Sequence, residues 1–219
     1  MGAKRTRADL SKAEILDAAR ELARRDGMDF AMRDLAEALN TWPNAIYGHF
    51  KNKFTLQQEL VDHILDQAFT GEVFRELLNE ETSWEDRLRR GGQEIFDVCS
   101  RYYGLGRLLS AHGMGSTSKA MQLIPALVMM LMRQGLSEVR AATIMQAATV
   151  YICSMGDMAA MFERGITNRE AFLGTLDTTS GGPMADTMEV FFAYKKAERV
   201  KEGIDMFIAA AKAEIGELR

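Results

Sequence analysis

The hydrophobic positions of residues 32–53 repeat with the spacing of two short helices. Leu35 and Leu39 lie four residues apart, which places both on one face of a first helix. Ile46 and Phe50 show the same spacing further along the chain. Because each pair can bury its side chains against the other, the pattern predicts two short helices that share a small core.

The residues between these two helices have backbone preferences that fit a tight turn. Asn40 falls where the chain needs a positive φ, which asparagine tolerates second only to glycine. Pro43 suits the first turn of a helix, where no backbone N–H is needed, and Ala36 leaves room for a close helix crossing. Each residue alone would also fit an ordinary helical hairpin. Together, at this spacing, they favour a helix-turn-helix that enters the major groove of DNA.

The rest of the pattern predicts an all-α protein. The chain contains only three prolines, and it lacks the alternating runs of valine and isoleucine that are typical of strands. A segment with three glycines, at 174–183, is expected to form a loop. Helices are predicted over about 55–76, 84–103, 121–133, 138–164, 184–196 and 199–218, with a short helix that ends near residue 112.

Charge is distributed unevenly along the chain. Residues 1–53 carry ten Lys/Arg and eight Asp/Glu, whereas residues 54–219 carry 17 and 23. A basic amino end on an acidic body is typical of a DNA-binding segment joined to a second domain. Lys4, Arg5 and Arg7 form a basic arm that either lies on the DNA or remains a solvated, disordered terminus.

Several other classes of protein lack their usual signals in this chain. Three histidines are present, but no Glu-x-x-His pair, phosphate-binding loop or zinc-ligand spacing accompanies them. Cys99 and Cys153 are too few and too far apart for a disulfide scaffold, which fits a reducing compartment. No apolar run of membrane-spanning length and no signal-peptide pattern is present. We therefore expect a cytoplasmic protein that is not an enzyme, with no cofactor and no membrane partner.

Residues 12–60 resemble the amino-terminal domain of the TetR/AcrR-type transcriptional regulators. The motifs that carry the resemblance are ILDAARELARRDG from residue 15, MRDLAEAL from residue 32 and AIYGHFKNK from residue 45. In the last of these, Tyr47, His49, Phe50 and Lys53 match the Tyr-x-His-Phe-x-x-Lys signature of the family. The resemblance implies that Tyr47 and Lys53 touch the DNA backbone and that His49 lies beside it.

The resemblance also implies that the start of the second helix reads bases. Two departures from the family pattern are Ala31, where a Ser or Thr normally caps the first helix of the motif, and Trp42, where a small polar residue is common. We expect Asp29 to act as the cap instead. The full set of residues predicted to bind DNA is Arg5, Arg33, Thr41, Trp42, Pro43, Asn44, Tyr47, His49 and Lys53.

Methionine is concentrated in the second half of the chain, where nine of the fifteen lie between Met114 and Met161. Methionine side chains are flexible and polarizable, so they line adaptable pockets as well as fill irregular gaps in a core. The concentration is therefore compatible with an apolar ligand cavity or with plain core packing, and the resemblance implies a cavity. The lining predicted for it is Phe96, Tyr103, His112, Met129, Tyr151 and Met155.

These observations lead to one main hypothesis and two alternatives. We expect a helix-turn-helix DNA-binding domain at 1–54 and a helical ligand-binding and dimerisation domain at 55–219. Small residues in the helices at 138–164 and 199–218 would allow the four-helix dimer interface that the resemblance implies. The predicted function is a homodimeric repressor that binds a palindromic double-stranded operator and is released by a small, largely apolar effector. The alternatives are a ligand-independent architectural DNA-binding protein and a helical enzyme.

Overall fold

The computed structural model describes residues 4–112, 120–166 and 197–217 of the chain. The described residues form helices and connecting turns, with one isolated β-bridge and no strand, so the predicted all-α fold is confirmed. The bounds are a 3-10 turn at Arg7–Asp9, α1 Lys12–Asp26, α2 Met32–Ala38, α3 Pro43–Tyr47, α4 Lys53–Ala68, α5 Gly71–Leu78, α6 Trp84–Arg101, α7 Leu105–His112, α8 Ala120–Arg133, α9 Glu138–Glu163 and α12 Ala197–Glu217.

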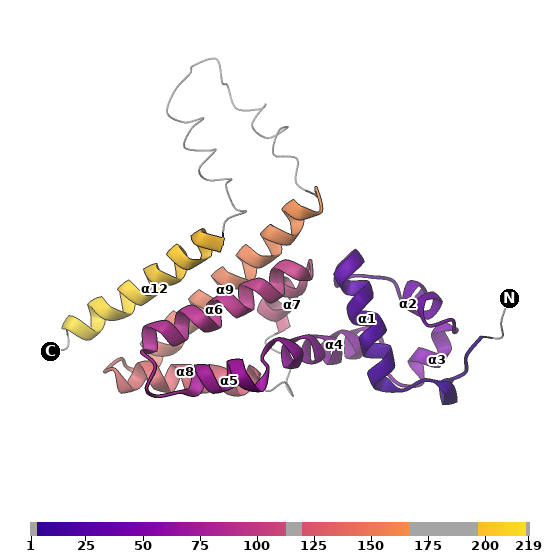
Figure 1. Cartoon of the computed structure of the whole chain (residues 1–219), viewed down its shortest axis with the longest axis horizontal. Coiled ribbons are helices and arrows are strands. Elements are labelled where there is room, and N and C mark those ends of the chain that lie inside the picture. Colours follow the sequence, from indigo (N-terminus) through magenta and orange to yellow (C-terminus); the bar gives the residue numbers. More distant parts are fainter. Residues whose placement is uncertain (1–3, 113–119, 167–196, 218–219) are drawn as a thin grey trace, which may run out of the picture.

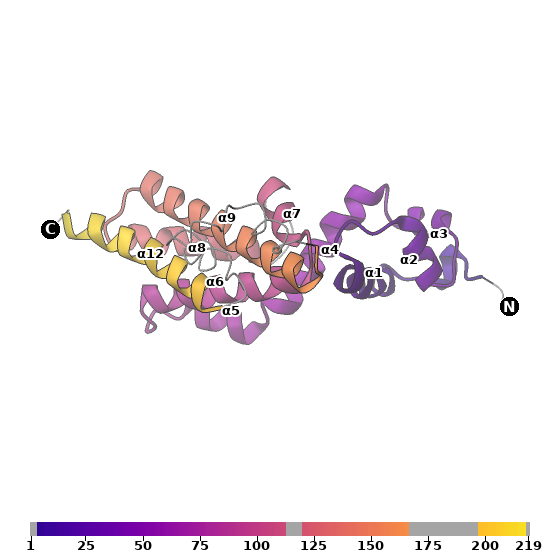
Figure 2. The same ribbon diagram turned by 90° about the horizontal axis from the view of Figure 1, so that it is seen from above.

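The molecule is elongated, with two groups of helices along its length (Figure 1). Helices α1, α2 and α3 gather at one end, which we call the head, and α5–α9 with α12 form the body. Helix α4 leads from the head into the body, and the same arrangement is seen from above (Figure 2). The carboxyl end of α12 therefore lies at the far end of the molecule from the helix-turn-helix.

The head forms around the hydrophobic positions that the sequence pattern singled out. Leu35, Leu39, Ile46 and Phe50 are all buried, and they pack against the buried face of α1 in one core cluster. Asn40 has a φ of 50°, so the residue predicted to adopt the left-handed conformation is the one that does. The local pattern thus determined both the helices and the turn that joins them.

The amino end of α2 is not capped in the expected way. Ala31 occupies the cap position and makes no side-chain hydrogen bond. Asp29, the expected substitute, instead forms an ion pair with Lys53, with 2.8 Å between its Oδ1 and the lysine Nζ. The prediction that Asp29 caps this helix is therefore wrong, because a cation at the start of α4 engages its carboxylate.

The long helix predicted at 55–76 is divided into two. Helix α4 ends at Ala68, and α5 begins at Gly71 after Phe69 and Thr70. Phe69 adopts φ −83° and ψ 65°, which is outside the helical region, and its side chain is buried in the body. The break turns the chain and directs an aromatic ring into the core, a tertiary contact that no local pattern reveals.

The body is built around α6, which contacts α4, α5, α8, α9 and α12. Gly156 on α9 allows the closest of these approaches, because a Cβ at this position would collide with Cys99 on α6. The observed α9 and α12 agree within two residues with the helices predicted at 138–164 and 199–218. The predicted loop at 174–183 and helix at 184–196 lie outside the described residues.

Candidate DNA interface and body cavity

Helix α3 presents its polar side outward at the end of the molecule. Ile46 is buried, and Asn44 is exposed on the opposite side of the helix. Trp42, the residue before the helix, has 63% of its surface exposed, and Tyr47 has 43% exposed. Pro43 occupies the first helical position, where its ring is half-buried. Four of the predicted DNA-contacting residues thus share an accessible surface around one short helix.

Thr41 does not share this surface. Its side chain is only 1% exposed, and its hydroxyl donates a hydrogen bond of 2.6 Å to the carbonyl oxygen of Arg5. The backbone N–H of Arg5 in turn donates to the carbonyl of Asn40 over 2.9 Å. A hydroxyl buried and engaged in this way cannot reach a base edge, so the base-reading role predicted for Thr41 is corrected to a structural one.

The basic arm is therefore ordered against the turn from residue 4 onward. Lys4 Nζ lies 3.6 Å from the centre of the Trp42 ring, which is the geometry of a cation–π contact. The Arg5 guanidinium pairs with Glu14 at 2.5 Å and lowers the pKa of that carboxyl through the hydrogen bond. The positive charge of Arg5 is thus already matched by a carboxylate, whereas Lys4 lies beside the exposed indole.

The predicted phosphate contacts lie next to this surface. His49 Nε2 is 3.2 Å from the carbonyl oxygen of Arg7, which fixes the ring beside the arm. Lys53 stands at the first position of α4, and its ammonium group lowers the pKa of Asp29 through their hydrogen bond. Arg33 on α2 has a side chain that is 87% exposed. Lys53 would have to exchange Asp29 for a phosphate in order to contact DNA.

Residues 15–60 match the family model described as "Bacterial regulatory proteins, tetR family". The matched segment contains α2, α3 and the start of α4, with the exposed surface described above. The amino-terminal part of the chain thus matches the TetR family over its helix-turn-helix. This confirms the resemblance that the three motifs indicated.

Solved structures extend the similarity of fold to the body. A possible TetR family transcriptional regulator from Streptomyces coelicolor A3(2) superposes with a TM-score of 0.77 at 18% identity, over 93% of this chain and 99% of its own. A TetR variant from Acinetobacter baumannii AYE in complex with minocycline gives 0.64 at 21%, over 94% and 98%. BioQ with its double-stranded DNA operator gives 0.58 at 23%, over 71% and 93%.

No curated protein matches the chain. Among the helices of the described residues, none is both long enough and apolar enough to span a membrane. The family model and the solved structures together show that this chain has the fold of the TetR-type regulators.

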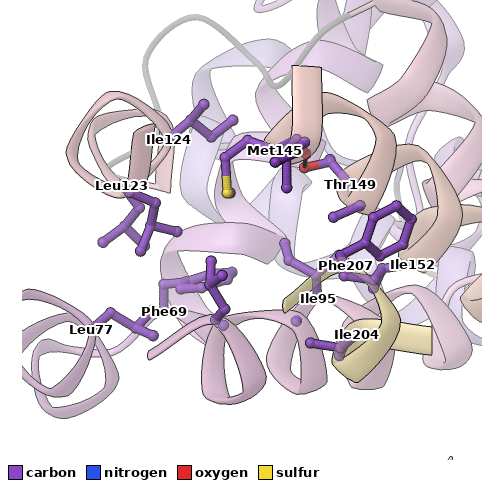
Figure 3. Close-up of a pocket in the computed structure, with 16 residues that line it drawn as sticks. Phe69, Leu77, Ile95, Leu123, Ile124, Met145, Thr149, Ile152, Ile204 and Phe207 are labelled. Atoms are coloured by element: carbon purple, nitrogen blue, oxygen red, sulfur yellow. Dashed lines mark hydrogen bonds between the residues drawn. The ribbon is translucent and has the colours of Figure 1, made fainter. Parts of the chain in front are cut away.

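The body contains an apolar cavity of about 70 Å³ (Figure 3). Side chains from α5, α6, α8, α9 and α12 converge on it, together with Phe69 from the break after α4. This is room for a small apolar group, and a larger ligand would require the lining side chains to move. The lining consists of Phe69, Leu77, Leu88, Gly91, Gly92, Ile95, Leu123, Ile124, Leu127, Ile144, Met145, Ala148, Thr149, Ile152, Ile204 and Phe207.

The cavity offers a ligand almost no polar group. Thr149 is the one lining residue with a polar side chain, and its hydroxyl already donates to the carbonyl of Met145 over 2.8 Å. None of the described residues that line the cavity has a charged side chain. A ligand here would gain its affinity from apolar burial, and a charged group would lose its hydration without compensation.

The structure places the predicted lining residues elsewhere. Phe96 and Met155 are buried in the core, Tyr103 lies at the junction with the head, and Met129 is 54% exposed. Tyr151 packs against the ring of Phe207. The side chain of His112 lies outside the described residues.

Two of these differences, at Phe96 and Tyr151, have the same cause. Ile95 and Ile152, which do line the cavity, each directly neighbour a predicted residue, Phe96 and Tyr151. One residue corresponds to a rotation of about 100° around a helix, so at these two positions the predicted side chain lies next to the face that lines the cavity. The adjacent Gly91 and Gly92 inside a helical pattern were the available signal, because they mark a place where side chains leave space.

A substitution at Gly91 tests whether ligands enter the cavity. A Cβ at Gly91 would meet Leu77 at 3.4 Å, an ordinary contact, so alanine fits there and fills part of the cavity. We expect Gly91→Ala to raise stability by roughly 0.5–1 kcal/mol, since glycine weakens a helix interior. It should also reduce the rise in melting temperature that benzene produces in the wild type. Differential scanning fluorimetry measures both effects.

Gly216→Ala in α12 is the matched control, because no atom lies within 4 Å of the added Cβ and the position is far from the cavity lining. It should leave the benzene response unchanged. An equal benzene response in Gly91→Ala and wild type would show that ligands do not enter this cavity.

The body meets the head at the turn between α6 and α7. The carbonyl of Tyr103 accepts a hydrogen bond of 2.8 Å from the backbone N–H of Met28, and Gln57 on α4 donates to the Met28 carbonyl over 3.0 Å. On the body side, Asp157 of α9 accepts backbone N–H groups from Gly104, Gly106 and Arg107. Burial raises the pKa of Asp157. This turn therefore connects α9 to the head through hydrogen bonds.

Proposed function

We propose that the protein is a homodimeric, ligand-responsive transcriptional repressor that binds a palindromic operator and is released by a small, largely apolar effector. The observation that carries the proposal is the presence, in one chain, of an exposed helix-turn-helix and an apolar cavity. The DNA complex of BioQ and the minocycline complex of the TetR variant support it by similarity of fold. The apolar cavity favours this function over a ligand-independent architectural role.

We assign the exposed residues of the head to two kinds of DNA contact. Trp42, Pro43 and Asn44 read base edges, because they stand at the exposed start of α3, the end of a recognition helix that enters the major groove. The phosphate contacts are Tyr47, His49, Lys53 and the exposed Arg33, while Arg5 holds the arm against the turn. We place the boundary between the DNA-binding and ligand-binding domains at residue 54, within the first turn of α4.

The dimer interface that we propose lies on the outer faces of α9 and α12, which contact one another within the chain. Val139 and Met206 are each 73% exposed there, although both are apolar. Most of the other exposed residues on these faces are small or uncharged: Ala142, Thr143, Gln146, Ala147, Val150 and Ser154 on α9, and Ala209, Ala210 and Ala213 on α12. The charged exceptions are Arg140 near the start of α9 and Glu202 on α12. Such faces allow close packing with a second copy around a two-fold axis.

Release requires an effector that binds the two states of the protein differently. An occupant of the cavity would press on Phe69 at the end of α4 and on the lining residues of α6. Both helices lead to the head, α4 directly and α6 through the hydrogen bond from Met28 to Tyr103. A shift in either helix would change the separation of the two heads, and with it the fit to successive major grooves.

The decisive experiment begins with selection of bound sequences from a random DNA pool. The selected DNA should contain an inverted repeat whose half-sites are about 34–36 Å, or a multiple of that, apart. Fluorescence anisotropy should then show an affinity that falls steeply as salt concentration rises. The proposal is abandoned if no sequence is enriched, or if binding is insensitive to salt.

A further inference from the structure

A second hollow, an open polar groove of about 600 Å³, crosses the outer side of α6. It lies on the other side of this helix from the apolar cavity, which is lined by residues 88, 91, 92 and 95 of α6. Ile204 lines both hollows. Four cationic residues and two carboxylates border the groove, whose lining is Glu76, Thr82, Asp86, Arg87, Arg89, Arg90, Gln93, Lys201 and Ile204.

Two of the three arginines are fully occupied by carboxylates. Arg89 pairs with Asp205 at 2.7 Å and with Asp86 at 2.9 Å. Arg90 pairs with Glu94 at 2.6 Å and with Glu76 at 3.1 Å. These hydrogen bonds raise the pKa of both guanidinium groups. Their positions are explained by contacts within the chain, between α6 and the helices beside it.

Arg87 differs from its two neighbours. The Nε atom of Arg87 is buried, and this atom has no hydrogen-bond partner within the part of the chain that the structure describes. Lys201, on the opposite border, is exposed and forms no ion pair with any described residue. A buried donor without an acceptor weakens the folded state unless something supplies the acceptor. The groove therefore borders two groups that the described residues leave without an acceptor, the Nε of Arg87 and the ammonium of Lys201.

We propose that this groove binds an anionic oxygen group, a phosphate or a carboxylate, on the guanidinium of Arg87. Both groups present two oxygens in the geometry that an arginine fork recognises through paired hydrogen bonds. The hydroxyl of Thr82 and the ammonium of Lys201 border the same groove and add a donor and a charge. The acid is either a free small anion or the head of an apolar molecule, and this site is independent of the DNA-binding surface.

Thermal unfolding of the full chain tests the proposal. Melting temperature is measured with sodium phosphate, sodium acetate and sodium decanoate, each against sodium chloride at equal ionic strength. We expect at least one of the three anions to raise the melting temperature by a few degrees, because binding to the folded state alone stabilises it. A response to phosphate or acetate identifies a free anion, and a response to decanoate alone identifies an acid on an apolar chain.

Substitutions show whether the rise in melting temperature depends on Arg87. Arg87→Gln should abolish the shift, whereas Arg101→Gln should retain it, because Arg101 is exposed at the end of the same helix and does not line the groove. Arg87→Lys, which keeps the charge and the aliphatic stem, should lose most of the shift because lysine lacks the planar fork. A full shift in both Arg87 variants, or no shift with any of the three anions, overturns the proposal. Operator binding by the same proteins is a separate measurement that neither outcome alters.

Discussion

We expect Ala147→Arg to convert the proposed homodimer to a monomer. Ala147 is exposed in the middle of the outer face of α9, among uncharged neighbours that include Thr143 and Val150. A two-fold interface would bury the new arginine twice, with no carboxylate on that face of α9 to pair with it. Burying an unpaired charge costs several kcal/mol, so the dissociation constant of the dimer should rise by a factor of about 100 or more.

Size-exclusion chromatography with light scattering measures the change in mass, and anisotropy measures the accompanying loss of operator affinity. Met129→Arg is the matched control, because Met129 is also an exposed apolar residue but lies on α8. It should leave both measurements unchanged. A dimer that survives Ala147→Arg would place the interface on another face of the body.

The second large effect concerns the division of roles on the head. Asn44→Ala should change which operators are preferred and cost about 1–3 kcal/mol on the best one, because an amide that pairs with a base edge is lost. Lys53→Ala should weaken binding to all DNA sequences alike, because a phosphate contact is lost. The slope of log affinity against log salt concentration should also fall by about one for each head. Titrations with the selected operator and with a scrambled duplex separate the two outcomes.

Glu72→Ala, at an exposed position on α5, is the control and should behave as wild type. If Asn44→Ala and Lys53→Ala reduced binding to both duplexes in the same proportion, the distinction between base-reading and phosphate-contacting residues would be wrong. Lys53→Ala also removes the ion pair with Asp29, so its melting temperature should be measured beside its affinity.

Much of the head could be predicted because its determinants are local. A four-residue spacing on each helix, an asparagine that tolerates positive φ and a proline at the first helical position act within a few residues of each other. The ordered arm could not be predicted in the same way. The contact between Arg5 and Thr41 joins residues 36 positions apart, and it removes Thr41 from the DNA-contacting surface.

The body was harder to predict for the same physical reason. Its helices could be located from periodicity, but the break at Phe69 depends on a tertiary contact in the core. The cavity depends on the phase of five helices at once, so an error of one residue in a single helix exchanges a lining residue for a packed one. The concentration of methionine indicates the correct part of the chain but not the correct side chains, since Met145 is the only methionine among the described residues that lines the cavity.

The two tryptophans of the chain occupy opposite parts of the molecule. Trp42 is largely exposed at the start of α3 beneath Lys4, whereas Trp84 begins α6 in the body, with Lys212 of α12 6.0 Å from its ring. Indole emission depends on the polarity and charge around the ring. The protein thus carries two intrinsic fluorophores, one in the surface proposed to contact the operator and one beside the packing of α12 against α6. A single-tryptophan variant would isolate either signal without a chemical label.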